Sequence, residues 1–574
     1  MQPTLAHPAS MTPPESGKIA GNRTWRSVLL AIPLLSVLAF SGCASLPDQV
    51  DRPISTALAN PTETRLGSLV AQRAATAGTR NDSAFALVGS ADLAFTSRMT
   101  LIKAAQKTLD IQYYAIFQDD TTQRMFDAMR EAANRGVRIR ILLDDFNTSG
   151  KNAQVLRLGF EKNFEVRLFN PLPGGRQSLF FRIITNLKDV EGMQRRMHNK
   201  IFVADNAVAI TGGRNLGETY FGQSKGTNFV DIDILAAGRI ARDLSRSFDQ
   251  YWNNPLAYPV QSLMTEKELA DIKPKAEPNA PGSPVPTVSP EASVPDAKTS
   301  TVAATVTLPE LADSTNLRLL TWTWAPSVML ADKPSKIAAD ADTTEEAGDT
   351  TVDGLLQLIS QAKTTVLIVS PYFVPGERMM KQFADLRQRN IRVRVLTNSL
   401  ASNDAPAAHV GYSRYRKDLL AMGVEIHEMR AEQEGTFSSF GSSFGSGSGA
   451  GASSSGKSGT GSTGNSRASL HSKVVVIDER LLVVGSMNLD LRSQLQNSEV
   501  AIVIRNRGIS GEAIRLIEPT IQTGAYKVEL VDGQLLWKAP PGASFKDASS
   551  EPDASAGLKL LVHLIGPFAP DEML

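Results

Sequence analysis

Two short segments of this 574-residue chain carry the same pattern of one histidine, one lysine and one aspartate. Both segments read H-x-K-x4-D, and each is followed by a glycine turn that ends in asparagine. The residues are His198, Lys200, Asp205 and Asn215 in the first copy and His471, Lys473, Asp478 and Asn488 in the second. The chain has six histidines, so the presence of two of them in one repeated setting favours a shared chemical role.

These residue types are sufficient for cleaving a phosphodiester without a metal ion. A neutral histidine can attack phosphorus and form a covalent phosphohistidine. A second, protonated histidine can donate a proton to the leaving oxygen and then deprotonate the incoming hydroxyl. The lysines and asparagines can hold the phosphoryl oxygens as negative charge builds. The duplicated motif therefore predicts one active site shared by two halves of the chain, each giving a histidine and a lysine.

The elements that must position the motif also occur twice. Alternating apolar residues predict two pairs of β-strands, at 105–112 with 362–369 and at 135–142 with 389–396. Helices are predicted between these strands, at 121–134 and 376–388. Each motif opens an apolar run. We therefore expect its histidine and lysine to lie on a β-strand with their side chains on one face, and its aspartate to lie near the far end.

The motifs and their flanks resemble the phospholipase D superfamily. Several flanking blocks resemble its bacterial cardiolipin synthase branch, and within it the C type; they are residues 111–114, 142–145, 195–200, 212–215, 397–400, 409–412 and 485–493. The resemblance covers residues 50–265 and 313–574. It implies an α/β fold of two tandem phospholipase D-like α/β/α sandwich lobes, related by a pseudo-twofold axis and sharing one active site.

The resemblance also implies roles for the motif residues. They are the nucleophile His198, the general acid and base His471, the phosphate-binding Lys200 and Lys473, and the assisting Asn215 and Asn488. The residues alone do not distinguish the nucleophile from the acid. The family requires no metal, and no cofactor is expected.

Four carboxylates complete the expected site. The resemblance implies that a further carboxylate hydrogen-bonds the histidine, and the strands after the motifs offer Asp231 and Glu499 as candidates. Asp205 and Asp478 belong to the catalytic motif itself. We expect these two to brace the motif rather than to touch substrate.

We expect the chain to consist of six parts, separated in part by stretches of biased composition. Residues 272–306 are rich in Pro, Ala, Ser and Thr, and residues 435–467 are dominated by Gly and Ser, so neither stretch can build a core. The expected parts are a lipoprotein-type signal peptide (1–42), an N-terminal segment (43–90), lobe 1 (91–265), a Pro/Ala-rich linker (266–312), lobe 2 (313–545, with a flexible insert at 435–467) and a C-terminal tail (546–574).

The N-terminus carries the one cysteine of the chain, Cys43, which excludes an intrachain disulfide. Basic residues, an apolar run at 28–40 and small residues around Cys43 resemble a bacterial lipoprotein signal in which Cys43 is lipidated. An uncleaved N-terminal anchor is the alternative. We expect a membrane-anchored lipoprotein of the bacterial cell envelope, in the inner or the outer membrane.

Three functions remain open. The first is transfer of a phosphatidyl group to a lipid hydroxyl such as that of phosphatidylglycerol, with phosphatidylethanolamine as a further partner. The second is hydrolysis of phospholipids or nucleic acid, and the third is lipid binding without catalysis. The intact motifs disfavour the third. The signal and the net charge of +1 favour membrane phospholipids as partners over nucleic acid.

The remaining histidines of the two lobes suit structural positions. His409 is expected to be structural, with a pocket-lining role as the alternative, and His427 alternates with apolar residues as in a strand. The segment 558–565, which contains His563, predicts a short amphipathic helix. We expect this helix to pack in the core, with contact to lipid as the alternative.

Overall fold

The structure is a computed structural model that describes residues 46–264, 321–338, 350–432 and 467–566, apart from 175, 177–181, 185, 187–189 and 225. The predicted signal peptide with Cys43 and the predicted linker at 266–312 lie outside the described residues. The predicted Gly/Ser insert also lies outside them, except that its last residue, Arg467, begins a strand.

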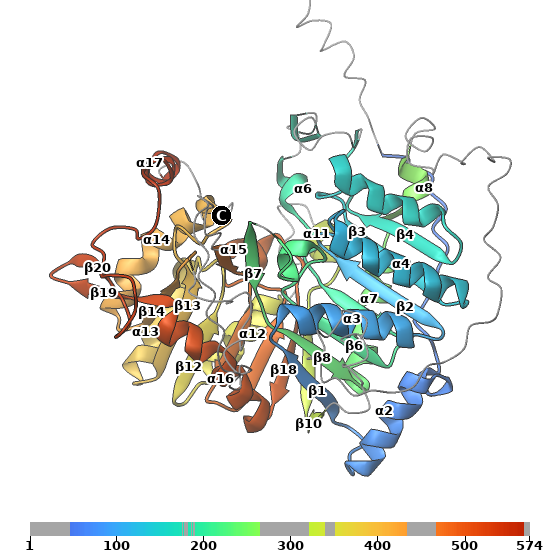
Figure 1. The fold of residues 1–574 in the computed structure, drawn as a ribbon, viewed down its shortest axis with the longest axis horizontal. Helices are drawn as coiled ribbons and strands as arrows, with labels where there is room; N and C mark the ends of the chain where they lie inside the picture. Colours follow the sequence, from blue (N-terminus) through green and yellow to red (C-terminus); the bar gives the residue numbers. More distant parts are fainter. Residues whose placement is uncertain are drawn as a thin grey trace, which may run out of the picture. The chain divides into compact units, whose positions relative to one another are not determined.

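Within the described residues, the strands form two nine-stranded sheets and one two-stranded sheet (Figure 1). In spatial order the first sheet contains β10 (Thr323–Ala325), β1 (Ser83–Val88), β8 (Asp233–Ala237), β6 (Val208–Gly212), β5 (Ile201–Ala204), β2 (Thr108–Tyr113), β3 (Arg138–Asp144), β4 (Phe164–Phe169) and β9 (Ala257–Pro259). The second contains β11 (Ser327–Ala331), β18 (Val500–Arg505), β17 (Leu481–Gly485), β16 (Val474–Ile477), β12 (Thr365–Val369), β13 (Arg392–Asn398), β14 (Glu425–Met429), β19 (Ala525–Val531) and β20 (Gln534–Lys538). The small sheet pairs β7 (Thr227–Val230) with β15 (Arg467–Leu470).

The two large sheets repeat one topology. The order β1-β8-β6-β5-β2-β3-β4-β9 corresponds position by position to β11-β18-β17-β16-β12-β13-β14-β19. In each, the three strands that alternate with helices run parallel and the others pair antiparallel. The motif strands β5 and β16 lie in the middle and are buried along their whole length, which explains their unbroken apolar sequences. The predicted pair of related α/β lobes is confirmed.

Helices cover both faces of each sheet. Those of the first lobe are η1 (Pro61–Glu63), α2 (Arg65–Thr76), α3 (Ala91–Ala104), α4 (Asp120–Asn134), η2 (Gly150–Phe160), α6 (Val190–Gln194), η4 (Glu218–Tyr220), α7 (Arg239–Trp252) and α8 (Val260–Leu263). Those of the second are α11 (Ser335–Ala338), α12 (Thr351–Ser360), α13 (Gly376–Gln388), α14 (Pro406–Ala421), α15 (Leu491–Leu495), α16 (Arg507–Thr523) and α17 (Ala556–Ile565). The helices predicted at 121–134 and 376–388 are α4 and α13.

The lobes share an apolar core. One cluster of buried residues joins α7 and strands of the first sheet to α16 and strands of the second, with Leu244 and Ile517 among its members. Two further clusters of buried apolar residues fill the outer sides of the sheets, one cluster in each lobe. Burial of this shared apolar surface stabilises the two lobes as one body.

The first sheet reaches beyond the proposed boundaries of lobe 1. It begins at β1, before residue 91, and it includes β10, which follows the proposed linker and pairs antiparallel with β1. Directly after β10 the chain enters the second sheet as β11, which pairs with β18. The passage between the lobes therefore lies between these two strands.

The helix predicted around His563 is α17, but it contains no buried residue, so the prediction that it packs in the core is wrong. Three of its leucines, Leu560, Leu561 and Leu564, are exposed because only one side of the helix contacts the lobe. No helix in the described part of the chain is long and apolar enough to cross a membrane.

Candidate active site

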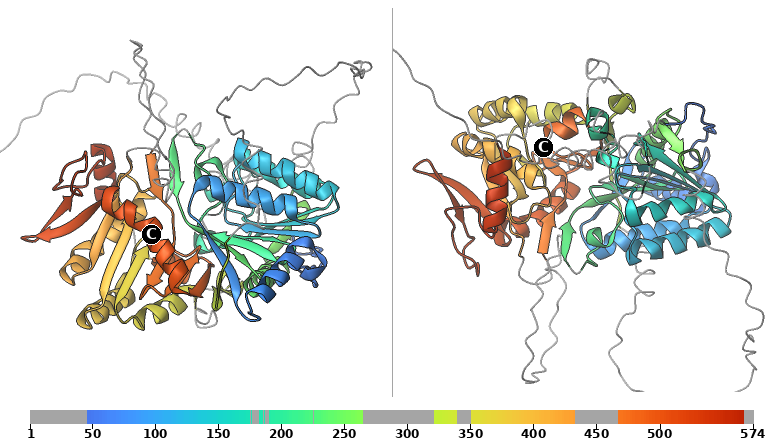
Figure 2. Two further views of the ribbon diagram at one scale, coloured as in Figure 1. Left: turned by 60° about the horizontal axis from the view of Figure 1, so that its bottom comes forward. Right: turned by 90° about the horizontal axis from the view of Figure 1, so that it is seen from above.

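Each motif histidine is held by the main chain of the other lobe. Strand β15 ends at Leu470 and runs parallel to β7 of the first lobe, and the main-chain N–H of His471 donates to the carbonyl of Val230 at 2.9 Å. In the related position, the N–H of His198 donates to the carbonyl of Ser498 at 2.9 Å. Figure 2 shows β7 and β15 side by side where the lobes meet. The two histidines are thereby brought to one place.

The motif histidines and lysines precede their strands, which corrects the prediction that they lie on them. Strand β5 begins at Ile201 and β16 at Val474, so only the apolar run of each motif joins the ladder. The backbone before β5 makes hydrogen bonds outside the strand ladder. The N–H of His198 donates to the other lobe, and the carbonyl of Lys200 accepts from the hydroxyl of Thr211 at 2.7 Å.

Glu499 is the carboxylate partner of His198. The Nδ1 of His198 lies 3.0 Å from both carboxylate oxygens of Glu499, which is fully buried. The hydroxyls of Ser486 and Ser493 donate to the same carboxylate. A carboxylate that accepts from Nδ1–H fixes the tautomer of the imidazole and leaves the lone pair on Nε2. His198 is thereby arranged to react through Nε2.

Asp231 holds His471 in the same way. The Nδ1 of His471 lies 3.0 Å from Oδ2 of Asp231, which is also fully buried. The two carboxylates occupy related positions, because each comes two residues before the partner of a motif glycine, in the pairs Gly212 with Asp233 and Gly485 with Ala501. Each histidine therefore takes its carboxylate from the opposite lobe.

Burial sets the charge state of the site. It lowers the pKa of both histidines well below the usual value, and the charge of the neighbouring lysines lowers it further. Burial also raises the pKa of Glu499 to about 7 and that of Asp231 to about 6. The lowered pKa of the histidines favours an uncharged imidazole, as a nitrogen nucleophile must be. The carboxylates titrate in the same range, so each pair can hold a proton.

Both motif lysines are buried beside the histidines. The Nζ of Lys200 donates to the carbonyl of His198 at 2.7 Å, and that of Lys473 donates to the carbonyl of His471 at 2.6 Å. Lys473 Nζ also lies 3.0 Å from Nδ1 and 3.3 Å from Nε2 of His471. Burial lowers the pKa of Lys473 to about 8, so its ammonium is weakly solvated and available to an anionic oxygen.

The two asparagines differ in their partners. Asn215 donates through Nδ2 to the hydroxyl of Tyr220 at 3.0 Å and accepts through Oδ1 from the N–H of Ala115. The main-chain N–H of Asn488 donates to the hydroxyl of Ser493, while its buried side-chain Oδ1 has no hydrogen-bond partner among the described residues. Asn488 thus keeps side-chain capacity for a ligand, whereas Asn215 is tied to an aromatic residue of the site.

Asp205 and Asp478 lie at the far ends of the motif strands, away from the histidines. Each sits in a turn with positive φ (52° and 51°) and accepts from successive main-chain N–H groups at the start of the neighbouring strand. For Asp205 these groups belong to residues 106–108, and for Asp478 to residues 363–365. The geometry matches the bracing role expected for them.

Three aromatic rings that we did not assign from the sequence surround the histidines. Tyr114 lies edge to face with His198 at 5.1 Å between ring centroids. Tyr220 and Phe229 approach His471 at 5.2 Å and 5.0 Å. The rings exclude water and fix the imidazole planes. The one signal in the sequence is the position of Tyr114 directly after a buried strand, because the residue that follows β2 faces the same edge as the motif.

The other histidines of the lobes have structural positions. His409 is buried on α14 with Nε2 3.3 Å from Glu551 of the C-terminal region. His427 lies within β14, as predicted.

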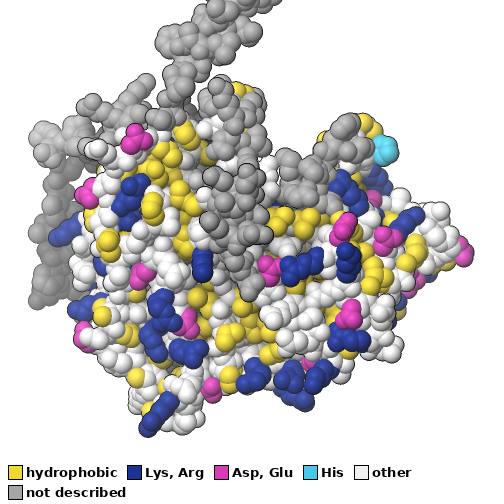
Figure 3. Space-filling view, turned by 180° about the vertical axis from the view of Figure 1, so that it is seen from behind, with side chains coloured by type: hydrophobic (Ala, Val, Ile, Leu, Met, Phe, Trp, Pro, Cys, Tyr) yellow, Lys and Arg dark blue, Asp and Glu magenta, His cyan; other side chains and the backbone are white. Residues whose placement is uncertain are grey.

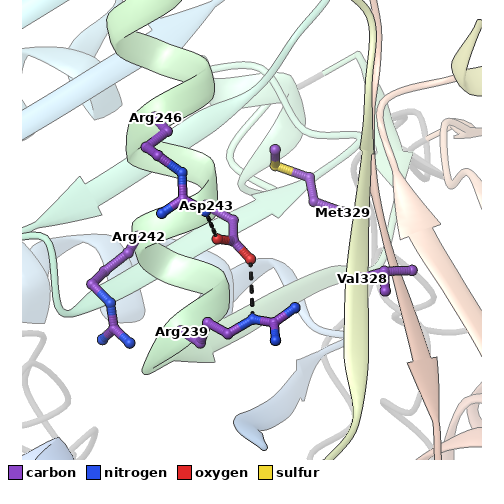
Figure 4. Close-up of a pocket in the computed structure, with 6 residues that line it drawn as sticks. All are labelled: Arg239, Arg242, Asp243, Arg246, Val328 and Met329. Carbon is purple, nitrogen blue, oxygen red and sulfur yellow. Dashed lines mark hydrogen bonds and ion pairs between the residues drawn. The ribbon is translucent and has the colours of Figure 1, made fainter. Parts of the chain in front are cut away.

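A surface hollow of about 530 Å³ between α7 and β11 contains no motif residue (Figure 4). Its arginines Arg239 and Arg246 pair with Asp243, which offsets much of their charge.

Several known proteins are similar to this chain. Residues 99–252 and 355–519 match the family model described as cardiolipin synthase, PLD-like domain. The chain is 34% identical over 427 residues to cardiolipin synthase C of Escherichia coli K12, covering 73% of this chain and 80% of that protein. It is 30% identical over 544 residues to an uncharacterized protein of Helicobacter pylori, covering 92% and 96%. A phosphatidylserine synthase from Haemophilus influenzae matches in structure with a TM-score of 0.47 and 14% identity, over 79% of this chain and 91% of that one. The chain therefore belongs to the phospholipase D superfamily, in the cardiolipin synthase family of enzymes.

Proposed function

We propose that this enzyme transfers a phosphatidyl group, through a phosphohistidine, to a lipid hydroxyl such as that of phosphatidylglycerol. The observation that carries the proposal is the reciprocal exchange of carboxylates, in which His198 pairs with Glu499 and His471 with Asp231 across the lobes. This arrangement provides two oriented imidazoles at one phosphorus-binding position. The similarity to cardiolipin synthase C supports a lipid donor and a lipid acceptor.

In the first step, the Nε2 lone pair of His198 forms a bond to phosphorus and the bond from phosphorus to the leaving oxygen breaks. The proton held by the pair of His471 and Asp231 passes from Nε2 of His471 to that oxygen, which leaves as an alcohol. In the second step, His471 takes a proton from the incoming hydroxyl, whose oxygen attacks phosphorus and releases His198. Glu499 stabilises the positive charge that His198 acquires, and Lys200 and Lys473 hold the phosphoryl oxygens.

The lysine positions support His198 as the nucleophile. Lys473 Nζ lies 3.0 Å from Nδ1 and 3.3 Å from Nε2 of His471, so its positive charge stands against that ring and disfavours the charge that the ring would acquire by attacking phosphorus. The hydrogen bond from Lys200 goes instead to the main-chain carbonyl of His198, and Nε2 of that ring is left clear of it. His198 is therefore the better nucleophile, which leaves the proton transfers to His471.

Lipid mass spectrometry tests the reaction. Purified protein is incubated with phosphatidylglycerol, with and without phosphatidylethanolamine, and a His198→Ala variant serves as the control. We expect cardiolipin and free glycerol in equal amounts, and neither from the variant. Phosphatidic acid without cardiolipin would show that water is the acceptor and that the enzyme is a phospholipase. No product from any phospholipid would indicate a lipid-binding protein without catalysis.

We further propose that the enzyme is attached to the bacterial envelope by lipidation of Cys43. The proposal rests on the resemblance of residues 18–44 to a lipoprotein signal. Intact-mass spectrometry of the membrane fraction should find a chain that begins at an acylated Cys43. An unprocessed N-terminus in that fraction would instead indicate an uncleaved anchor.

A further inference from the structure

Helix α17 is rich in apolar residues and yet lies on the surface. Six of its ten residues are Leu, Val or Ile, and none of the ten is buried. Leu560, Leu561 and Leu564 keep 57%, 45% and 59% of their surface exposed. A short helix with several large apolar side chains exposed together normally contacts a partner surface or lipid. Among the residues that the structure describes, none covers this stripe of leucines on α17.

The opposite side of α17 fixes the helix to the second lobe. Leu558, Val562 and Ile565 recur at helical spacing and are half-buried, on the side toward α14. Ser555 accepts from the N–H of Leu558 and caps the first turn, and Arg414 of α14 donates to the carbonyl of Gly566 at 2.6 Å. The helix is thus held in one orientation, with its leucine stripe directed away from the lobe.

Helix α14 leads from α17 toward the catalytic residues. Helix α14, on which α17 packs, begins at Pro406, directly after the loop that contains Asp404. The carboxylate of Asp404 accepts from the hydroxyl of Tyr372 at 2.9 Å, and its charge acts on both His471 and Lys473. Apolar side chains are visible at the upper right of Figure 3, where a half-turn from Figure 1 carries α17.

We propose that α17 docks on a bilayer of anionic phospholipid and thereby presents the active site to its substrate. The inference rests on the proposed function, because it takes the substrate to lie in a bilayer. Cationic groups border the leucine stripe as an interfacial helix requires, namely Lys559 and His563 on the helix and Arg414 at its end. Apolar side chains would enter the interface while these cations meet phosphate headgroups.

A fluorescent label on the stripe tests the contact directly. Cys43→Ala leaves the full chain without cysteine, and Leu561→Cys then accepts an environment-sensitive dye. The matched control carries the dye at Glu377→Cys, an exposed position on α13. We expect phosphatidylglycerol vesicles to shift the emission at 561 to the blue, phosphatidylcholine vesicles to shift it less, and neither to change it at 377. Unchanged emission at 561 would overturn the proposal, whether or not the enzyme has activity.

Turnover gives the second test. The variant Leu560→Ser, Leu561→Ser, Leu564→Ser should lose about tenfold or more of its activity on phosphatidylglycerol vesicles, since it loses the apolar area that binds the interface. On short-chain phosphatidylglycerol dispersed as monomers it should match the parent enzyme. A control with the exposed aliphatic residues Ile54, Val328 and Val531 changed to Ser should behave as the parent on both substrates. Equal losses on vesicles and monomers, or a parent protein that dimerises through the stripe, would contradict membrane docking.

Discussion

The substitution Glu499→Gln isolates the contribution of the carboxylate behind His198. The carboxylate accepts from Nδ1 of His198 and from the hydroxyls of Ser486 and Ser493, and its neighbours are all donors. An amide of the same shape presents an NH2 group to some of these donors. The imidazole then turns to the tautomer with its proton on Nε2, and the lone pair that should attack phosphorus is lost.

The expected loss in kcat is about 10³–10⁴-fold, because the corresponding change of Asp to Asn behind a catalytic histidine in serine proteases costs about 10⁴-fold. This corresponds to about 4–5.5 kcal/mol of the activation barrier. The substrate still meets both lysines, so KM should change far less than kcat. The assay is release of glycerol from monomeric phosphatidylglycerol at pH 7.

The same substitution should lower activity but raise the stability of the protein relative to the parent as the pH rises. Burial raises the pKa of Glu499 from 4.5 to about 7, so between these values the folded protein holds a proton that the unfolded chain has released. The free energy of unfolding contributed by this group therefore falls as pH rises through that window, by about 3 kcal/mol in total. Gln does not titrate. In urea unfolding, the free energy of unfolding of the variant relative to that of the parent should therefore be higher at pH 8 than at pH 5, by about this amount.

The two readouts together can refute the reasoning. The control is Glu428→Gln, which alters a fully buried carboxylate that contacts Arg416 and Trp537 but no motif histidine. It should keep kcat within about tenfold of the parent enzyme, because it leaves both histidine pairs intact. If Glu499→Gln also kept kcat within tenfold, the carboxylate would not control the tautomer of His198. If its stability relative to the parent did not change with pH, Glu499 would not be protonated in the folded state.

Three other predictions can be checked with the same protein. His198→Ala or His471→Ala should each abolish turnover, by at least about 10²–10⁴-fold, and parent-like activity in either would contradict the shared site. Asp205→Ala leaves three main-chain N–H groups at the start of β2 without their acceptor, so urea unfolding should show a loss of about 2–3 kcal/mol with a small change in kcat. EDTA should leave turnover intact, and a loss that a divalent ion restores would argue against the metal-free mechanism.

The sequence by itself determined the repeat, and it predicted the chemistry that we propose. The spacing within each H-x-K-x4-D motif is local, and the periodicity of the strands and helices around it depends on neighbouring residues, so both can be read without a fold. The helices α4 and α13 and the strands β2, β3, β12 and β13 occur where their patterns predict them. The alignment of the two halves also singled out Asp231 and Glu499, because related positions in a repeat carry related residues.

Tertiary structure alone decided how these residues combine. His198 and Glu499 are 301 residues apart and His471 and Asp231 are 240 apart. The first pair forms because the backbone of the first motif bonds to Ser498, and the second because β15 pairs with β7. No local pattern encodes such an exchange. The same holds for α17, whose apolar sequence suggested a core helix. The structure leaves one of its faces exposed because α14 covers only the other, and burial depends on what the rest of the chain brings alongside.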